Sequence, residues 1–172
     1  YGLVSNDSGG DNAAYGYQAL TNNTRGSQNV AMGPNTLLYN KGNNGSTAIG
    51  YQAMMNPDTS EFFPEQRTTY NTAIGYESLK GNYPPWNNTG TDNTATGTGA
   101  LEMNTGGTYN TAMGVFALNA NKLGRENTAL GALALQKNDR GFGNTALGKS
   151  ALNANVGGST NTAIGVEAML VS

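Results

Sequence analysis

The sequence predicts an all-β protein, a parallel β-solenoid in which one short unit is stacked on itself many times. A five-residue motif, Asn-Thr-Ala-apolar-Gly, occurs nine times in the chain, most cleanly at 71–75 and 161–165. The interval between successive copies is seventeen in six of the eight cases, and longer between the third and fifth copies. A short fixed period indicates one structural unit repeated along an axis. The copies begin at Asn12, Asn29, Ser46, Asn71, Asn93, Asn110, Asn127, Asn144 and Asn161.

The unit, numbered from the motif Asn, repeats further residues at fixed positions. Position three is Ala and position five is Gly in every copy, position nine is Leu or Met, and positions twelve and fifteen are mostly Asn and Gly. Two Gly per unit would break a helix, so short strands joined by tight turns fit better. The repeat residues that we expect to have a structural role are Asn71, Ala73, Ile74, Gly75, Leu79, Ala112, Leu118, Ala129 and Leu135.

The motif strand should be apolar on both faces. Alternation along a strand places Thr and the apolar residue on one face, and Asn, Ala and Gly on the other. We expect the Ala-Leu pair at positions eight and nine to be divided between two faces in the same way. A solvated single-layer coil would not need apolar side chains on both faces, so the second face predicts a partner. The stacked Asn side chains are expected to hydrogen-bond along the axis and to the turn backbone.

The composition argues against several classes of function. The chain has no Cys and no His, so the usual general bases, thiol nucleophiles and most transition-metal ligands are missing. We therefore expect no enzyme activity and no cofactor. Nine Lys and Arg are scattered among eleven acidic residues, which does not favour nucleic-acid binding. No apolar run is longer than four residues, as at 168–171, which is far too short to insert into a membrane.

The whole chain, 1–172, is expected to form one solenoid of about ten coils. Residues 1–11 fit the register, because Leu3, Asn6 and Gly9 fall in the Leu, Asn and Gly columns. The chain starts and ends midway through a unit, which suggests a piece of a longer fibre or ends that stack on other copies. Loop insertions are expected at about 55–70 and 81–92, where the two longer intervals fall.

The two insertions contain the best candidates for ligand contact. Insertions in consecutive units of a stack project from the same corner, so their loops should lie side by side. They contain aromatic side chains, which commonly mark binding surfaces when exposed. The alternative is that these rings pack on one another and cover a neighbouring chain. The four candidates are Phe62, Phe63, Tyr83 and Trp86.

The motif Asn-Thr-Ala-Ile-Gly, with its Ala-Leu pair and its Asn and Gly corners, resembles the head repeats of trimeric autotransporter adhesins. Those repeats have the motif Ser-Val-Ala-Ile-Gly and a somewhat shorter period, and similar repeats with the period found in this chain occur in phage tail fibres. The resemblance covers residues 12–169. It implies a left-handed parallel β-roll, with three chains wound side by side outside the cell. Thr mostly replaces the Val of the family motif, as at Thr72, Thr111 and Thr145.

Three functions follow as expectations. The first is an extracellular structural or adhesive fibre segment, a trimeric β-roll whose loops attach to a glycan or protein of a host cell surface. The second is a homopolymeric extracellular filament built by end-to-end stacking of coils. The third is a glycan-binding or ice-binding solenoid. Shared repeats indicate architecture and leave the ligand open.

Overall fold

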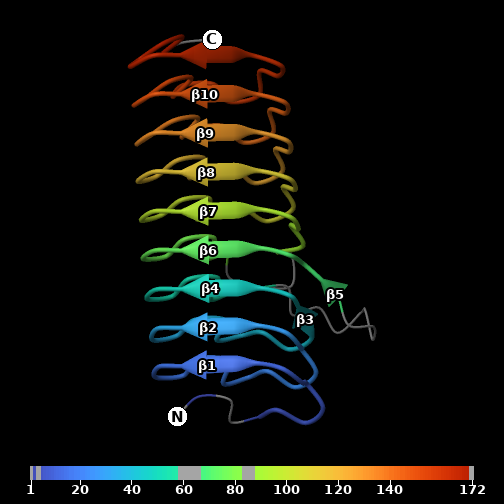
Figure 1. Ribbon diagram of the computed structural model, residues 1–172. Helices are drawn as coiled ribbons and strands as arrows, with labels where there is room; N and C mark the ends of the chain where they lie inside the picture. The colour runs from blue at the N-terminus through green and yellow to red at the C-terminus, as the bar shows by residue number, and fades with distance from the viewer. Residues whose placement is uncertain (1, 3–4, 58–66, 83–87, 171–172) are drawn as a thin grey trace.

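The computed structural model describes residues 2, 5–57, 67–82 and 88–170. Within them the chain is a stack of coils along one axis, and each coil contributes one strand to a parallel sheet of nine strands (Figure 1). All secondary structure in these ranges is β or turn, which confirms the predicted all-β solenoid. The strands are β1 (Ala13–Tyr15), β2 (Val30–Met32), β4 (Thr47–Ile49), β6 (Thr72–Ile74), β7 (Thr94–Thr96), β8 (Thr111–Met113), β9 (Thr128–Leu130), β10 (Thr145–Leu147) and β11 (Thr162–Ile164).

Each strand covers positions two to four of the unit, and the strands pair in register. Ala112 of β8, for example, lies opposite Ala95 of β7 and Ala129 of β9. The side chains alternate as expected, since Ala112 is fully buried whereas Met113 is 46% exposed. The Ala at position three therefore faces the interior, and the residue at position four faces outward.

The Gly at position five ends each strand because no other residue fits there. Its φ lies between 123° and 137° in all nine copies, a region that residues with a Cβ rarely adopt. A Cβ placed on Gly131 would lie 2.5 Å from the carbonyl oxygen of Gly148 in the next coil. The corners of successive coils thus meet backbone to backbone.

The Ala-Leu pair does not form a second strand, and the prediction that its side chains point to opposite faces is wrong. Ala117 and Leu118 are both fully buried, and the same holds for Ala134 and Leu135. The cause is the backbone at position nine, where φ lies between 47° and 52° in every copy. This left-handed conformation turns the Leu side chain to the side that the preceding Ala already occupies.

The core is a set of side-chain columns that run through the whole stack. It consists of the Ala at position three, the Ala at position eight and the Leu or Met at position nine. Among the predicted structural residues, Ala73, Leu79, Ala112, Leu118, Ala129 and Leu135 belong to this core. Each coil therefore contacts mainly its two neighbours, and the core extends along the axis without a single centre.

The insertions leave the main sheet unbroken. Strands β4 and β6 pair directly although the first insertion lies between them in the sequence. A second, two-stranded parallel sheet forms beside the stack, where β3 (Asn43–Asn44) pairs with β5 (Arg67–Thr68) (Figure 1). Thr69 then leads back into the coil, and its hydroxyl lies 2.7 Å from that of Ser46.

Candidate interaction surface

Two ladders of buried Asn side chains hold the coils in register. In the first ladder, at position one, the backbone N and Nδ2 of Asn127 both donate to Oδ1 of Asn110, at 3.1 Å each. The Nδ2 of Asn127 also donates to the carbonyl oxygen of Gly141 at 2.8 Å. The same pattern joins Asn144 to Asn127 and Asn161 to Asn144. The predicted axial Asn ladder is confirmed, and it holds the motif Asn of each coil in line with that of the next.

The second ladder, at position twelve, stabilises the same corner, because both ladders donate to the carbonyl of the Gly at position fifteen. Asn138 Nδ2 donates to Oδ1 of Asn121 at 2.8 Å and to the carbonyl oxygen of Gly141 at 3.1 Å. Asn6 takes its predicted place in this ladder, because its Oδ1 accepts a hydrogen bond from Asn23 Nδ2. Leu3, assigned to the Leu column, lies outside the described residues. Both ladders are buried along most of their length, so their side chains stabilise the coil. Any contact with another molecule must therefore be made by the outward-facing positions.

The outward-facing apolar side chains gather along the corner that the motif Gly makes. We define the apolar ridge as the residues at positions four and six, which flank this corner at the arrowhead ends of the strands in Figure 1. Of twenty large apolar side chains exposed in the described part of the chain, eleven belong to the ridge. They are Tyr15, Tyr17, Met32, Tyr51, Ile74, Tyr76, Met113, Val115, Leu147, Ile164 and Val166.

The ridge is almost free of charge. Across all nine copies of the unit, Lys149 is the only charged residue at positions two, four and six. The Thr column at position two lies beside the ridge on the same outward face of the sheet, in seven consecutive copies from Thr47 to Thr162. A long uncharged apolar strip of this kind is unusual on a surface that only meets water.

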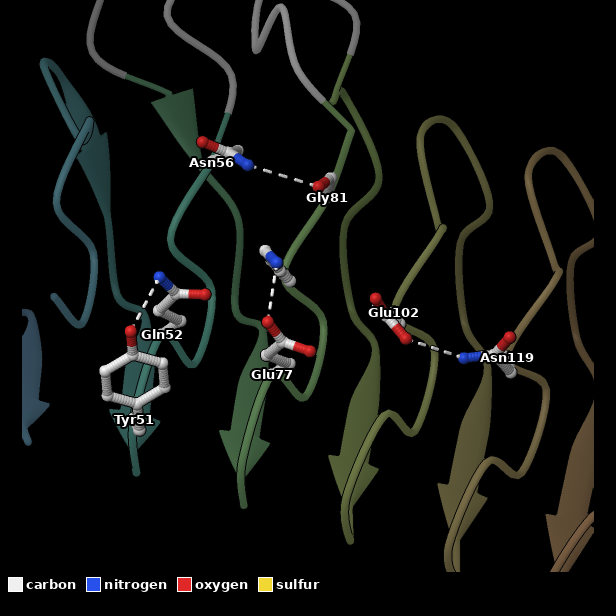
Figure 2. A network of polar contacts seen from close by, with 8 residues as sticks. Tyr51, Gln52, Asn56, Glu77, Gly81, Glu102 and Asn119 are labelled. Atoms are coloured by element: carbon white, nitrogen blue, oxygen red, sulfur yellow. Dashed lines mark hydrogen bonds and ion pairs between the residues drawn. The ribbon is translucent and has the colours of Figure 1, made fainter.

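The aromatic residues of the ridge all lie in its first four coils, and in the last four coils every ridge residue except Lys149 is aliphatic. The rings of Tyr51 and Tyr76 stack with centroids 5.3 Å apart and planes inclined by 17°. The Tyr51 hydroxyl accepts a hydrogen bond from Gln52 Nε2 at 3.3 Å (Figure 2). Stacked rings in successive coils support one another and stiffen the ridge.

Polar side chains at positions seven and ten of several coils lie beyond the ridge. Lys80 Nζ pairs with Glu77 Oε1 at 2.7 Å, and Asn119 Nδ2 donates to Glu102 Oε2 at 2.9 Å (Figure 2). The first pair lies within one coil, and the second joins two successive coils. Both contacts are partly exposed. The remaining exposed apolar residues of the described ranges, such as Leu123 and Val156, lie at other positions of the unit.

The sequence predicts only part of the ridge. Ile74, a predicted repeat residue, faces outward at 39% exposure and belongs to it, and Gly75 forms its corner. Position six escapes sequence reasoning because its residues vary, although Tyr17, Tyr51 and Tyr76 are a recognisable aromatic signal. The four predicted ligand residues, Phe62, Phe63, Tyr83 and Trp86, lie outside the described residues, so their role stays a prediction.

Other kinds of site are not found in the described ranges. No helix there is long and apolar enough to cross a membrane. No three acidic side chains in these ranges come together as a possible metal site. Comparisons of the chain with protein-family models, with curated proteins and with solved structures find no match.

Proposed function

We propose that this chain is a rigid segment of an extracellular fibre, in which three copies pack side by side through their apolar ridges. The observation that carries the proposal is the ridge itself, an exposed and nearly uncharged apolar strip along the stack. Burying such a strip removes apolar surface from water and favours association. The resemblance of the motif to adhesin head repeats supports a left-handed β-roll and three chains.

A second copy of the chain is the partner that best fits the ridge. The ridge repeats once per coil, at the spacing of hydrogen-bonded strands, roughly 4.8 Å. A partner that covers it along its length needs the same straight axis and the same spacing. Another copy of the same solenoid has both, and symmetric association of identical chains is the commonest form of oligomer. The single Lys149 leaves little charge to be desolvated.

In a fibre of this kind, attachment to a host surface falls to the two insertions. In this proposal the ridge is covered by neighbouring copies, and the insertions at about 55–70 and 81–92 remain free to meet a host glycan or protein. Phe62, Phe63, Tyr83 and Trp86 are the residues proposed to make that contact. Replacing Trp86 with Ala should then reduce attachment and leave the melting temperature nearly unchanged. An equal loss of stability and attachment would show instead that the loop is a packed cover.

Disulfide cross-linking tests which surface joins the copies. The chain has no Cys, so a single introduced Cys reports on one position. Leu147→Cys places the thiol on the ridge, and Leu123→Cys is a matched control, since both parent side chains are exposed. Under mild oxidation we expect Leu147→Cys to form covalent dimers rapidly and Leu123→Cys to do so slowly. Equal rates for the two variants would contradict association through the ridge.

A further inference from the structure

A small, partly open pocket lies between the coils at the level of the insertions. Its volume is about 20 Å³, and it is bounded by residues of four consecutive coils. Met54 and Leu79 form part of its wall, and Asn56, Asn88 and Asn104 bring polar groups to it. No charged side chain of the described ranges lines the pocket. Its position coincides with the interruption of the second Asn ladder.

The ladder is interrupted in the third and fourth coils. Position twelve of the third coil is Pro57, which has neither a side-chain amide nor a backbone N–H to donate. Position twelve of the fourth coil is Asn82, which is exposed. Asn40 in the second coil still donates through Nδ2 to Oδ1 of Asn23, at 2.7 Å. Its own Oδ1 is buried and receives no hydrogen bond from the described residues. The regular ladder resumes only at Asn104.

Asn56, next to Pro57, replaces only part of what is missing. Its side chain is buried, and its Nδ2 donates to the carbonyl oxygen of Gly81 at 3.2 Å (Figure 2). Its backbone N donates to the carbonyl of Lys80, and its own carbonyl accepts from Asn88 Nδ2. The Oδ1 of Asn56 is the one polar atom of this residue left without a partner in the described part of the chain. Buried acceptors are normally paired with protein groups or with ordered water.

We infer that the pocket holds one ordered water molecule, which donates a hydrogen bond to Oδ1 of Asn56. One water needs a cavity of roughly 10–15 Å³, so the pocket has room for one. The neutral wall selects a neutral occupant, because a cation there would lose its hydration without meeting a carboxylate. The water then pairs the buried acceptor that Asn56 presents beside the interrupted ladder.

A high-resolution crystal structure of the full chain tests this inference. We expect a single density peak in the pocket, about 2.7–3.2 Å from Asn56 Oδ1. An empty pocket, a side chain filling it, or an ion with several oxygen ligands at about 2.3–2.6 Å would each overturn the inference. In the variant Asn56→Leu, which has no acceptor, the peak should disappear. A peak that persists unchanged in this variant would show that Asn56 does not hold the water.

Solution NMR provides a second test that does not depend on the variant folding. A long-lived water in the pocket should give nuclear Overhauser effects to the side-chain amide protons of Asn56 and Asn88. The matched controls are Asn121 and Asn138, whose ladder is intact and which do not line the pocket. Signals at the first pair and none at the second are expected. No signal at either pair, or equal signals at both, would overturn the inference.

Discussion

At the scale of single residues, the Leu at position nine combines a buried side chain with a left-handed backbone, two properties that rarely occur together. Its side chain is fully buried, and its backbone is left-handed, as at Leu118 with φ of 50°. A branched Cβ makes this backbone conformation a genuine outlier, whereas Leu and Met, which are unbranched at Cβ, tolerate it at a cost. The sequence agrees, since the nine copies contain only Leu and Met at this position and never Ile or Val.

Leu118→Ile should therefore destabilise the stack although the side-chain volume is unchanged. Forcing a β-branched residue into the left-handed region should lower the free energy of unfolding by about 1–3 kcal/mol. Leu118→Met is the matched control and should cost less than about 1.5 kcal/mol. Urea denaturation of both variants measures the difference. If Ile were tolerated as well as Met, backbone strain would not explain the composition of this column.

Removing the same side chain tests how tightly the thin core is packed. Leu118→Ala leaves a cavity that the neighbouring coils cannot fill, so it should cost about 2–5 kcal/mol. Leu123→Ala provides the comparison, because Leu123 is 54% exposed. Its replacement should change the unfolding free energy by less than about 0.5 kcal/mol. Similar costs for the two variants would contradict the assignment of the core.

At the scale of the structural elements, the first Asn ladder joins the corners of successive coils by side-chain hydrogen bonds, as the parallel sheet joins their strands by backbone hydrogen bonds. Asn127→Ala removes the acceptor of the Asn144 backbone N and Nδ2, and one of the two side-chain donors to the carbonyl of Gly141. Each buried group left unpaired should cost about 1–3 kcal/mol. Asn119→Ala serves as control, because its bonds are partly exposed and water can replace them. Thermal unfolding monitored by circular dichroism should show a much larger loss for Asn127→Ala.

The motif strand can be predicted from the sequence, and the turn that follows it cannot. Asn, Ala and Gly at fixed positions identify β8 and its corner because alternation and glycine backbone freedom are local properties. The pair Ala117-Leu118 looks like a strand since nothing in two apolar letters indicates a left-handed Leu. Strands β3 and β5 escape prediction, because Asn43–Asn44 and Arg67–Thr68 carry no apolar alternation. Their pairing depends on where the insertion returns to the stack.

The candidate site is predictable only where it coincides with the motif. Ile74 is identified because it falls at a repeated apolar position. Tyr51 and Tyr76 are missed because position six also contains Pro34, Thr98 and Lys149, so no residue type repeats there. A column becomes visible in sequence when its composition is constrained by packing inside one chain. A surface column is constrained by its partner, which the sequence does not show.

At the scale of the whole molecule, the proposal predicts that charge on the ridge separates the copies. Met113→Lys combined with Leu147→Lys would place two uncompensated charges in the interface, at a considerable desolvation cost. We expect this double variant to sediment as a folded monomer at concentrations where the parent chain is associated. The control, Leu123→Lys with Val156→Lys, adds the same charge away from the ridge and should leave the mass unchanged. A parallel loss of mass in the control would point to a general effect of charge.

The mass of the native chain in solution tests the central claim most directly. Sedimentation equilibrium over a range of concentrations gives this mass without reference to shape. The proposal predicts an assembly of three copies, and therefore three times the chain mass of 17.8 kDa. A stable species of 17.8 kDa that unfolds cooperatively would show that the solenoid stands alone in water with its ridge exposed, and would contradict the proposed fibre assembly.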